Sequence, residues 1–404
     1  MQVAGVRLCI IMFKNSDVIS SSFSLCALSL ALETERERER KREKEFTHKS
    51  PQPPVITSPP PHSNVMNKQL AEFQEHLLKS KKIIALVGAG LSASSGLPVF
   101  RGSQGLWKNY NMIDLATPDA FYIDPGLVWQ FYSWRRYSAL RAEPNNGHIA
   151  LAKLSRIPNL KYLTILQNVD GLSSRKRTGD SDETHVHDPK KLYEIHGSLF
   201  TLKCTSFMCN QVEKNNFHQP LTPALEDTEF EYLNQRKKRG RDEDQASQDN
   251  VIDPILITNN QDTFTATSAS PQFLPVKTID EKDLPRCLVC DGLMRPGVVW
   301  FGESLPLNLI TGIDSFIEHG ERPDLILVIG TSGTVYPANS YVERVKLKGG
   351  KVAIFNMDIE DDVAEGRVDG TWGFKGDAAE LLPKALEPLI GKIERGKCDQ
   401  KCTE

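Results

Sequence analysis

The stretch GAGLSASSGLPVFRGSQGLW, residues 88–107, decides the fold of this chain. It follows the apolar run Ile83–Val87, which is typical of a buried strand. Glycines recur through the stretch, with alanine and serine between them. Glycine lets a backbone turn tightly and approach a ligand closely, and a strand that leads through such a loop into a helix aims backbone N–H groups at an anion. The stretch therefore predicts a phosphate-binding loop of an α/β protein.

Two common phosphate-binding motifs do not fit the spacing of these glycines. In the dehydrogenase fingerprint, the third glycine follows the second more closely than Gly96 follows Gly90. No Gly-Lys-Ser/Thr follows, which argues against a nucleoside-triphosphate P-loop. An ordinary strand-to-helix turn is the simplest alternative for the glycines alone. The continuation PVFRG, residues 98–102, decides the matter, because a phosphate loop does not need a Phe-Arg pair immediately after it.

The whole pattern, GAG-x-SA-x-SG-x-P-x-FRG, resembles the signature of the sirtuins, which are NAD-dependent protein-lysine deacylases. In that family the loop wraps the NAD pyrophosphate, and its Phe-Arg end closes over the nicotinamide ribose. The resemblance implies a first group of NAD-binding residues, which are Gly88, Ala89, Gly90, Ser92, Ala93, Pro98, Phe100, Arg101 and Trp107.

The composition limits the class of protein. A length of 404 residues with 39% hydrophobic content suffices for one large domain or two smaller ones. The net charge of -3 gives no global field that would attract nucleic acid or an acidic membrane, so protein or small-molecule partners fit better. The 8 cysteines in so long a chain do not indicate a disulfide scaffold. No apolar run reaches the roughly 18–20 residues that a membrane span requires.

Residues 1–65 are expected to be a disordered extension that ends in a Pro-rich linker. Val18–Leu32 is rich in serine and leucine but lacks a clear basic start, and the alternating charges of Glu33–Glu45 follow at once. A mitochondrial presequence is rich in arginine and poor in acids, so this composition gives a mitochondrial location little support. Met66 is a credible alternative start.

Residues 66–396 are expected to form the catalytic domain, and residues 397–404 a tail. Within this domain a small zinc-binding module is expected at about 200–295, and it contains a long polar loop at about 214–283. The loop carries the basic run Arg236–Arg241, but the acids that follow nearly cancel its charge. A charge-balanced loop therefore fits better than a nuclear-targeting or nucleic-acid patch.

Apolar strand candidates alternate with helical patterns, the first of which begins at Asn67. The strand candidates are Ile83–Val87, Tyr162–Leu166, Leu192–Ile195, Val298–Phe301, Leu325–Ile329 and Val352–Phe355. Near-continuous apolar strands of this kind indicate a Rossmann-like α/β fold, in which helices cover both faces of a parallel sheet. Ligands bind at the carboxyl ends of such strands, and each motif discussed here follows such an end.

Gln167-Asn168-Val169-Asp170 follows the Tyr162–Leu166 strand. Asn and Asp are common turn formers after a strand, which is the alternative for these residues taken alone. In sirtuins, Q-N-x-D supplies polar contacts around the nicotinamide and its ribose. The resemblance implies that Asp170 bonds the carboxamide, and that Gln167 and Asn168 order the ribose and a nearby water.

His196 lies in Glu194-Ile195-His196-Gly197-Ser198. A histidine at a strand end is most often a half-buried, hydrogen-bonded residue, but a neutral imidazole is also the side chain best suited to accept a proton near neutral pH. In sirtuins the histidine of this HG motif is the general base, so the resemblance implies that His196 is catalytic. His185 and His187 lie in a polar insert outside any family motif and are expected on the surface.

Cys287-Leu-Val-Cys290 has the C-x2-C spacing of a tetrahedral thiolate site, and Cys204 and Cys209 form a wider C-x4-C pair. Four reduced thiols without a metal are the alternative. Sirtuins carry two C-x2-C pairs in these places, so the resemblance implies one structural Zn²⁺ bound by the four cysteines. Four thiolates leave no open position for water, so this zinc would perform no chemistry.

Further motifs follow the later strand candidates. An exposed strand that ends in Phe301-Gly302-Glu303 can accept a peptide as an added strand. In sirtuins the acyl-lysine peptide is clamped between this FGE segment and the segment after the next glycine motif. The resemblance implies peptide contacts at Phe301, Gly302, Glu303, Val335 and Tyr336, and NAD contacts at Gly330, Thr331, Ser332, Asn356 and Ala378.

Tyr132 and Arg135 lie three residues apart on an expected helix, hence on one face. An aromatic stripe in the core with arginine toward solvent is the alternative. Together with Ala116, they match the sirtuin subclass that removes succinyl, malonyl and glutaryl groups from lysine. In that subclass Tyr and Arg bind the acyl carboxylate, and a small residue at the position of Ala116 leaves room for it. Arginine suits this role because its planar fork grips both carboxylate oxygens.

The sequence thus predicts an NAD-consuming protein-lysine deacylase that prefers acidic acyl groups and releases nicotinamide and O-acyl-ADP-ribose. Its expected partners are acyl-lysine proteins or peptides, with no clear nucleic-acid binding and no membrane. A plain deacetylase of the same fold, a mono-ADP-ribosyltransferase and an NAD-binding module without turnover are the alternatives. The subclass is often mitochondrial, and a cytoplasmic or nuclear location stays open.

Overall fold

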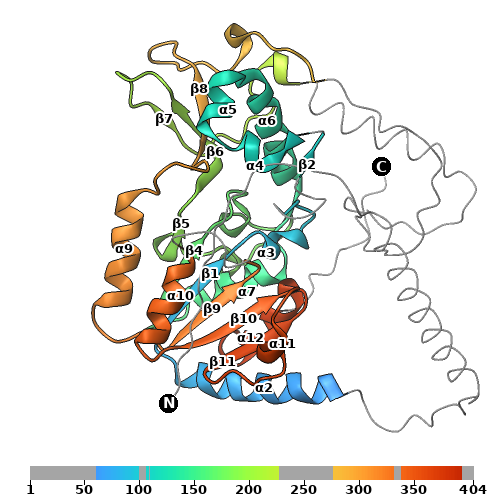
Figure 1. Cartoon of the computed structure of the whole chain (residues 1–404), viewed down its shortest axis with the longest axis vertical. Coiled ribbons are helices and arrows are strands. Elements are labelled where there is room, and N and C mark those ends of the chain that lie inside the picture. The colour runs from blue at the N-terminus through green and yellow to red at the C-terminus, as the bar shows by residue number, and fades with distance from the viewer. Residues whose placement is uncertain (1–60, 100–105, 109, 227–275, 332–337, 394–404) are drawn as a thin grey trace, which may run out of the picture. The chain divides into compact units, whose positions relative to one another are not determined.

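A six-stranded parallel sheet forms the centre of the part of the chain that the computed structural model describes, namely residues 61–99, 106–108, 110–226, 276–331 and 338–393 (Figure 1). The strand order is β11-β10-β9-β1-β4-β5. All neighbouring strands pair in parallel, which confirms the predicted fold class. The strands are β1 Lys82–Val87, β4 Lys161–Leu166, β5 Leu192–Glu194, β9 Leu325–Ile329, β10 Lys351–Asn356 and β11 Thr371–Lys375.

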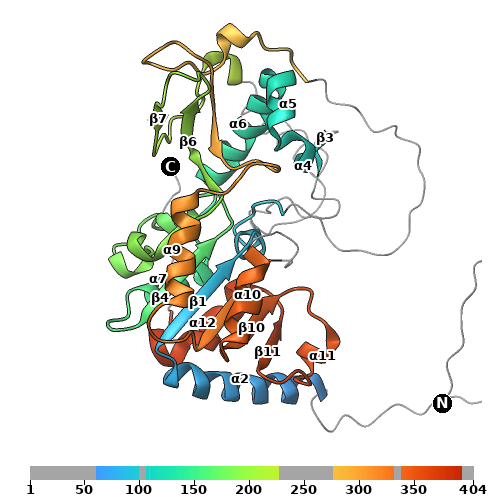
Figure 2. The same ribbon diagram turned by 60° about the vertical axis from the view of Figure 1, so that its left-hand side comes forward.

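Helices cover both faces of this sheet (Figure 2). Successive side chains of a strand point to opposite faces. In β1, Ile83 and Ala85 pack with helices α2, α7 and α12, whereas Ile84 and Leu86 pack with α9 and α10. Both faces of β1 are therefore buried, which explains why its sequence is apolar throughout.

The helices have the following bounds: α2 Pro61–Lys79, α3 Gly90–Ala93, α4 Met112–Leu115, α5 Pro118–Ile123, α6 Pro125–Arg141, α7 Asn146–Ser155, α9 Leu307–Glu318, α10 Ala338–Leu347, α11 Asp361–Ala364 and α12 Ala378–Ile390. Short 3-10 helices span Leu172–Ser174, Glu183–His185, Pro189–Lys191, Pro223–Leu225 and Glu281–Asp283. The predicted helical pattern corresponds to α2, which begins at Pro61, ahead of the predicted Asn67. Among the described residues, no helix combines the length and the apolar character that a membrane crossing requires.

A small module accompanies the main sheet and has its own core. Its antiparallel sheet consists of β6 Gly197–Cys204, β7 Val212–Glu213 and β8 Met294–Val298, and a hairpin is formed by β2 Leu106–Trp107 and β3 Tyr110–Asn111. Helices α4, α5 and α6 pack on this sheet in Figure 1. The core of the module joins Trp129 of α6, Leu202 of β6 and Met294 of β8.

The prediction that Val298–Phe301 is a strand of the parallel sheet is wrong. Strand β8 ends at Val298 and pairs antiparallel with β6. The Val299 N–H donates to the His196 carbonyl at 2.8 Å, and the Trp300 side chain packs into the core of the small module. An apolar run predicts burial, but it does not say against which sheet the strand will pack.

The prediction that His185 and His187 are surface residues is wrong for His187, which is 2% exposed. Its Nε2 lies 2.8 Å from Thr164 Oγ1 of β4, and its ring packs beside Tyr162 at 5.9 Å between centroids. His185 is half-buried and bonds Asp180 at 2.6 Å through Nδ1. The insert is polar in sequence, but His187 itself lies against β4, and this contact buries it.

The loops at the carboxyl end of the sheet are tied to one another by backbone hydrogen bonds. The Gly88 N–H donates to Ile329 O at 2.8 Å, the Gln167 N–H to Val87 O at 2.9 Å, and the Gly330 N–H to Phe355 O at 2.9 Å. The segments that follow β1, β4, β9 and β10 are thereby held along one edge, where parallel sheets bind ligands.

Candidate active site

The glycine loop after β1 packs directly against the loop after β9. A Cβ on Gly88 would lie 2.8 Å from Gly330 O, and one on Gly90 would lie 2.6 Å from Gly330 Cα. The Gly90 N–H donates to Gly330 O at 2.8 Å. Both glycines are therefore required by the contact between two backbones, rather than only by the approach of a ligand.

The exposed side of the two loops suits a pyrophosphate. Ala89, Gly90, Gly330 and Thr331 are half-buried, so their backbones reach the surface with only small side chains around them. Backbone N–H groups in such a loop bind anions well. The residues present thus fit an NAD pyrophosphate at this edge.

Ser92, Asn168 and Asp170 form a buried polar network beside the glycine loop. The Ser92 hydroxyl donates to Asp170 Oδ2 at 2.7 Å, and the Leu172 N–H donates to Asp170 Oδ1 at 2.9 Å. The Asn168 Nδ2 donates to Gly88 O at 3.0 Å and to Ser92 Oγ at 3.1 Å. These contacts fix the QNVD segment against the glycine loop, as the resemblance implies for one shared site.

His148 belongs to this network and was not predicted from sequence. Its Nδ1 accepts from the Asn145 N–H at 3.2 Å, so Nε2 carries the proton, and this atom lies 3.5 Å from Ser92 Oγ. Burial lowers the pKa of His148 to about 4, so the imidazole is neutral near pH 7. A signal was available, because Asn145 stands three residues before His148 at the start of α7, in the pattern of a capping box.

His196 is oriented by the backbone of the QNVD segment. Its Nδ1 lies 2.8 Å from the Gln167 carbonyl oxygen. A carbonyl only accepts, so Nδ1 carries the proton and the neutral ring keeps Nε2 as a proton acceptor. Burial lowers the pKa of His196, although the Gln167 carbonyl acts in the opposite direction. The arrangement is that of a general base that is ready at neutral pH.

Glu194 stands two residues before His196 and was also missed. The side chain is half-buried at the end of β5, and burial together with the negative charge of Asp170 raises its pKa to about 7. Near neutral pH this carboxyl is therefore partly protonated. Nothing in the sequence distinguishes it from an ordinary strand-end glutamate.

The remaining predicted NAD-binding residues continue along the same edge. The Asn356 Nδ2 donates to Thr331 O at 3.1 Å, and the Gly376 N–H donates to Asn356 O at 2.9 Å. Asp377 caps α12, whose first residue Ala378 is buried. The structure thus brings the ends of β9, β10 and β11 together with the glycine loop.

The other residues that were predicted to bind NAD or peptide lie elsewhere or outside the described residues. Trp107 packs against Phe131 at 5.6 Å between ring centroids, within the core of the small module. Ala93 is exposed and Pro98 is half-buried. Five predicted residues lie outside the described residues, namely Phe100, Arg101, Ser332, Val335 and Tyr336.

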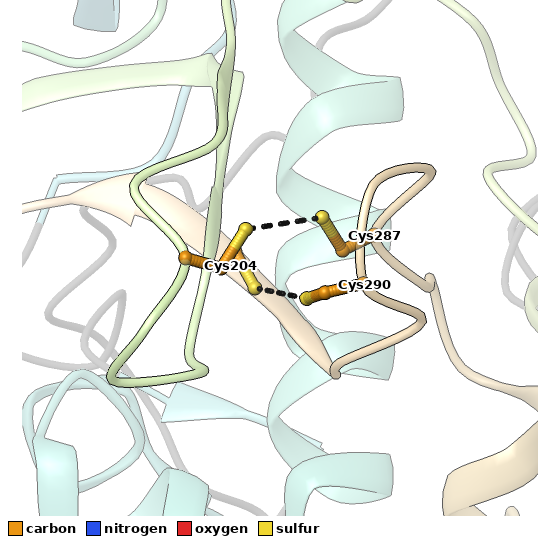
Figure 3. Close-up of side chains that lie close together, drawn as sticks. Cys204, Cys287 and Cys290 are labelled. Atoms are coloured by element: carbon orange, nitrogen blue, oxygen red, sulfur yellow. Dashed lines mark hydrogen bonds between the residues drawn. The ribbon is translucent and has the colours of Figure 1, made fainter.

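The four predicted zinc ligands lie together in the small module (Figure 3). Their sulfur atoms are all within 4.8 Å of one another. The Sγ atoms of Cys204 and Cys290 are 3.5 Å apart, and those of Cys209 and Cys287 are 3.8 Å apart. Tetrahedral thiolates at a Zn–S distance of about 2.3 Å lie about 3.8 Å apart. The wider first pair is accommodated by a turn in which the Cys209 N–H donates to Ser206 O at 3.0 Å. The cysteines are not in disulfides, and the cluster is consistent with structural zinc.

The predicted acyl-binding residues converge on a tryptophan that was not predicted. The Trp300 indole N–H donates to the Tyr132 hydroxyl oxygen at 2.9 Å, and the next residue, Phe301, donates its N–H to Ala116 O at 2.9 Å. The Arg135 guanidinium lies 5.5 Å from the centre of the Tyr132 ring. Tyr132 and Arg135 of α6 are thus linked through Trp300 to the contact between Phe301 and Ala116.

Glu303 is engaged within the protein. Arg295 donates to both of its oxygens, at 2.6 and 2.9 Å, and the Trp300 N–H donates to Oε2 at 2.8 Å. By contrast, Phe301 is exposed, and apart from its chain neighbours no described residue comes within 4 Å of the position that a Cβ on Gly302 would take. Only Phe301 and Gly302 of the FGE segment thus face outward.

Comparison with known proteins agrees with this geometry. The Sir2 family model matches residues 88–337, which is more than half of the chain. An NAD-dependent protein deacylase of Candida albicans is 70% identical over 329 residues, covering 81% of this chain and 100% of that protein. The mitochondrial NAD-dependent protein deacylase sirtuin-5 of Canis lupus familiaris is 36% identical over 327 residues, covering 80% of this chain and 86% of that protein.

A solved structure of a Sir2 homologue with NAD is also similar. It has 31% sequence identity and a TM-score of 0.52, and the match covers 80% of this chain and 93% of that one. The family model, the curated relatives and this structure indicate the same family as the glycine loop and the cysteine cluster do. The chain therefore belongs to the Sir2 family of NAD-dependent protein deacylases, the sirtuins.

Proposed function

We propose that this NAD-dependent deacylase prefers lysines that carry an acidic acyl group, such as succinyl, malonyl or glutaryl. The observation that carries the proposal is the position of Arg135 beside Tyr132, which Trp300 links to the contact between Phe301 and Ala116. The likeness to sirtuin-5 deacylases supports the same subclass. An acyl carboxylate bound there would gain the attraction of the Arg135 charge.

The energetics favour an acidic acyl group over acetyl. A hydrogen bond to a charged group contributes roughly 1.5–3 kcal/mol. Arginine can hold both oxygens of a carboxylate, and Tyr132 can donate a further hydrogen bond. An acetyl group carries no carboxylate, so it would gain neither of these charged hydrogen bonds.

The NAD site is proposed along the carboxyl edge of the main sheet. When bound, NAD supplies an electrophilic ribose carbon and the leaving nicotinamide. The loops at Gly88–Gly90 and Gly330–Thr331 would hold the pyrophosphate, and Asn356 the adenosine ribose. Asp170 would bond the carboxamide. His196 would accept a proton from the ribose hydroxyls at Nε2, because Nδ1 is already committed to the Gln167 carbonyl.

The peptide is proposed to lie along Phe301 and Gly302. Phe301 is exposed, and the open space around Gly302 leaves room for a second chain. Glu303 would act indirectly, because its carboxylate already accepts from Arg295 and from the Trp300 backbone. Its role would be to hold the shape of this segment.

Deacylation of matched succinyl-lysine and acetyl-lysine peptides tests the proposal. The wild-type protein is expected to favour the succinyl peptide, and Arg135→Met is expected to lower kcat/KM for that peptide by roughly 10- to 150-fold. Arg141→Met is the matched control, because Arg141 donates to Tyr137 at 2.7 Å on the last turn of the same helix. Equal rates for both peptides in the wild type, or an Arg135→Met variant with unchanged succinyl turnover, would refute the preference.

Mass spectrometry of the products separates the alternative activities. A deacylase yields free lysine peptide and O-acyl-ADP-ribose, whereas a mono-ADP-ribosyltransferase adds ADP-ribose to protein, and a binding module leaves the peptide intact. His196→Asn is expected to abolish deacylation while the protein still binds NAD. Normal turnover in this variant would end the assignment of His196 as the base.

We also propose a mitochondrial location, on the likeness to the mitochondrial sirtuin-5 relatives. A full-length chain with a C-terminal fluorescent tag is expected to coincide with a mitochondrial marker. A signal that stays in the cytoplasm or nucleus would contradict this location.

A further inference from the structure

Trp300 makes a buried hydrogen bond to the residue that is proposed to bind the acyl carboxylate. Its indole Nε1–H donates to the Tyr132 oxygen at 2.9 Å, and the two side chains are 2% and 1% exposed. The two residues are 168 positions apart in the chain, since Tyr132 lies on α6 and Trp300 follows β8. The contact is therefore a product of the tertiary structure.

This hydrogen bond determines whether the Tyr132 hydroxyl can act as a donor or as an acceptor toward a substrate. An indole N–H only donates, so the Tyr132 oxygen must accept from it. The Arg135 guanidinium lies beside Tyr132, 5.5 Å from the ring centre, and it too only donates. Because its oxygen already accepts from the indole, the Tyr132 hydroxyl proton is directed to an acceptor. No side chain or carbonyl of the described ranges accepts that proton.

An ionised carboxylate is the acyl terminus that complements this arrangement. It only accepts, and it can take the Tyr132 proton together with the charge of Arg135. A neutral acyl end supplies no strong acceptor. A hydroxyl that rotates freely could hydrogen-bond to either kind of acyl end. The Tyr132 hydroxyl, whose oxygen already accepts from Trp300, can hydrogen-bond only to an acceptor.

Trp300 is itself held rigidly. The Arg295 guanidinium stacks on its ring at 3.4 Å from the centroid, and Phe121 packs beside it at 5.2 Å. Glu303 then joins Arg295 to the Trp300 backbone N–H at 2.8 Å. The indole N–H is thus aimed at Tyr132 by contacts on both its side chain and its backbone.

We propose that Trp300 is a positioning residue for acyl specificity, which sets the Tyr132 hydroxyl as a donor toward the carboxylate of an acidic acyl group. This inference rests on the proposed preference for acidic acyl-lysine. It assigns to the residue before the FGE segment a role that neither the sequence pattern nor the peptide contacts of that segment require.

Trp300→Phe tests the inference, because phenylalanine keeps an aromatic ring under Arg295 and removes the N–H. The expected result is a rise of about 3- to 10-fold in KM for a succinyl-lysine peptide with little change in kcat, since the contact exists equally in the bound substrate and in the transition state. The ratio of succinyl to acetyl kcat/KM is expected to fall by the same factor. In a Tyr132→Phe background, Trp300→Phe is expected to have no further effect on this ratio.

Trp129→Phe is the matched control. Trp129 is a fully buried tryptophan whose N–H donates to Met294 O at 2.9 Å in the same core. Its loss is expected to lower the melting temperature and to leave the succinyl-to-acetyl ratio at the wild-type value. This control separates a general loss of stability from a specific effect on the acyl group.

The outcomes distinguish this inference from the proposed function. A wild-type protein that treats both peptides equally overturns the acidic preference and the role of Trp300 together. A wild-type protein that prefers succinyl, with Trp300→Phe retaining the full preference, overturns the role of Trp300 alone. An equal effect of Trp300→Phe with and without the Tyr132 hydroxyl also overturns it, because Trp300 would then act by another route.

Discussion

Replacing His187 with glutamine should make the protein less sensitive to acid. His187 is buried against β4, where Nε2 lies 2.8 Å from Thr164 Oγ1 and Nδ1 lies 3.0 Å from Asp188 O. Burial lowers its pKa from 6.5 to about 4; the Asp188 backbone and charge oppose this shift, and the positive charges of Arg156 and Lys191 add to it. The folded protein therefore resists protonation at His187.

The sign of the effect follows from proton binding in the two states. Below the ordinary pKa of 6.5 the unfolded chain binds a proton at His187, while the folded chain does so only near a pKa of about 4. Stability is therefore unaffected above this range and falls as the pH drops through it. Between about pH 7.5 and about pH 5.5 the loss amounts to about 1 kcal/mol for this one imidazole.

Urea unfolding of the wild type and of His187→Gln at these two pH values measures the effect. The pH-dependent loss in free energy of unfolding is expected to be smaller by about 1 kcal/mol in the variant, whatever its stability at the higher pH. Contributions from the cysteine cluster and from His148 are common to both proteins and cancel. His319→Gln, at an exposed histidine, is the control and should show the wild-type loss. The same pH-dependent loss in His187→Gln and wild type would refute the reasoning.

Three further predictions concern the candidate active site and the metal cluster. Gly90→Ala places a Cβ 2.6 Å from Gly330 Cα. The variant should therefore lose about 1–3 kcal/mol of stability and show a higher KM for NAD. A melting temperature and a KM equal to those of the wild type would contradict this prediction. Cys287→Ser removes one of four clustered thiols, so the zinc content of the purified protein should fall from about one ion per chain to near zero. Elemental analysis measures this content, and an unchanged zinc content would contradict the prediction. The lowered pKa of His196 means that kcat/KM should stay constant down to the ordinary histidine pKa of 6.5 and fall only below it, and a fall that begins above this value would contradict a neutral, buried base.

Much of the fold could be predicted because it depends on local pattern. The central strands are apolar on both faces, which is the signature of a parallel sheet between two helical layers, and β1, β4, β9 and β10 were all placed within about one residue. The motifs at Gly88, Gln167 and His196 follow strand ends in sequence, and parallel strands bring such ends to one edge. Position along the chain was therefore enough to predict that these motifs meet.

Contacts between distant segments were beyond the reach of the sequence. Arg135 and Arg136 are neighbours of identical chemistry, yet Arg136 is fully buried and donates to the backbone carbonyls of Leu199, Asn216 and His218, whereas Arg135 lies beside Tyr132. Helical spacing alone shows that the two arginines lie on different faces of α6. Which of these faces meets β6 depends on how α6 packs. The same holds for His187, whose polar surroundings in sequence concealed its burial against β4.

The sequence by itself determined the family, the parallel sheet, the meeting of the motifs at one edge of that sheet and the set of four cysteines, because each depends on residue types at short spacings. Only the tertiary structure decided that Gly90 is needed for contact with Gly330, that Val298–Phe301 leaves the main sheet, and that Trp300 bonds Tyr132. These facts join residues that are far apart in the chain. Their relative positions follow from the packing of whole elements, which local pattern does not encode.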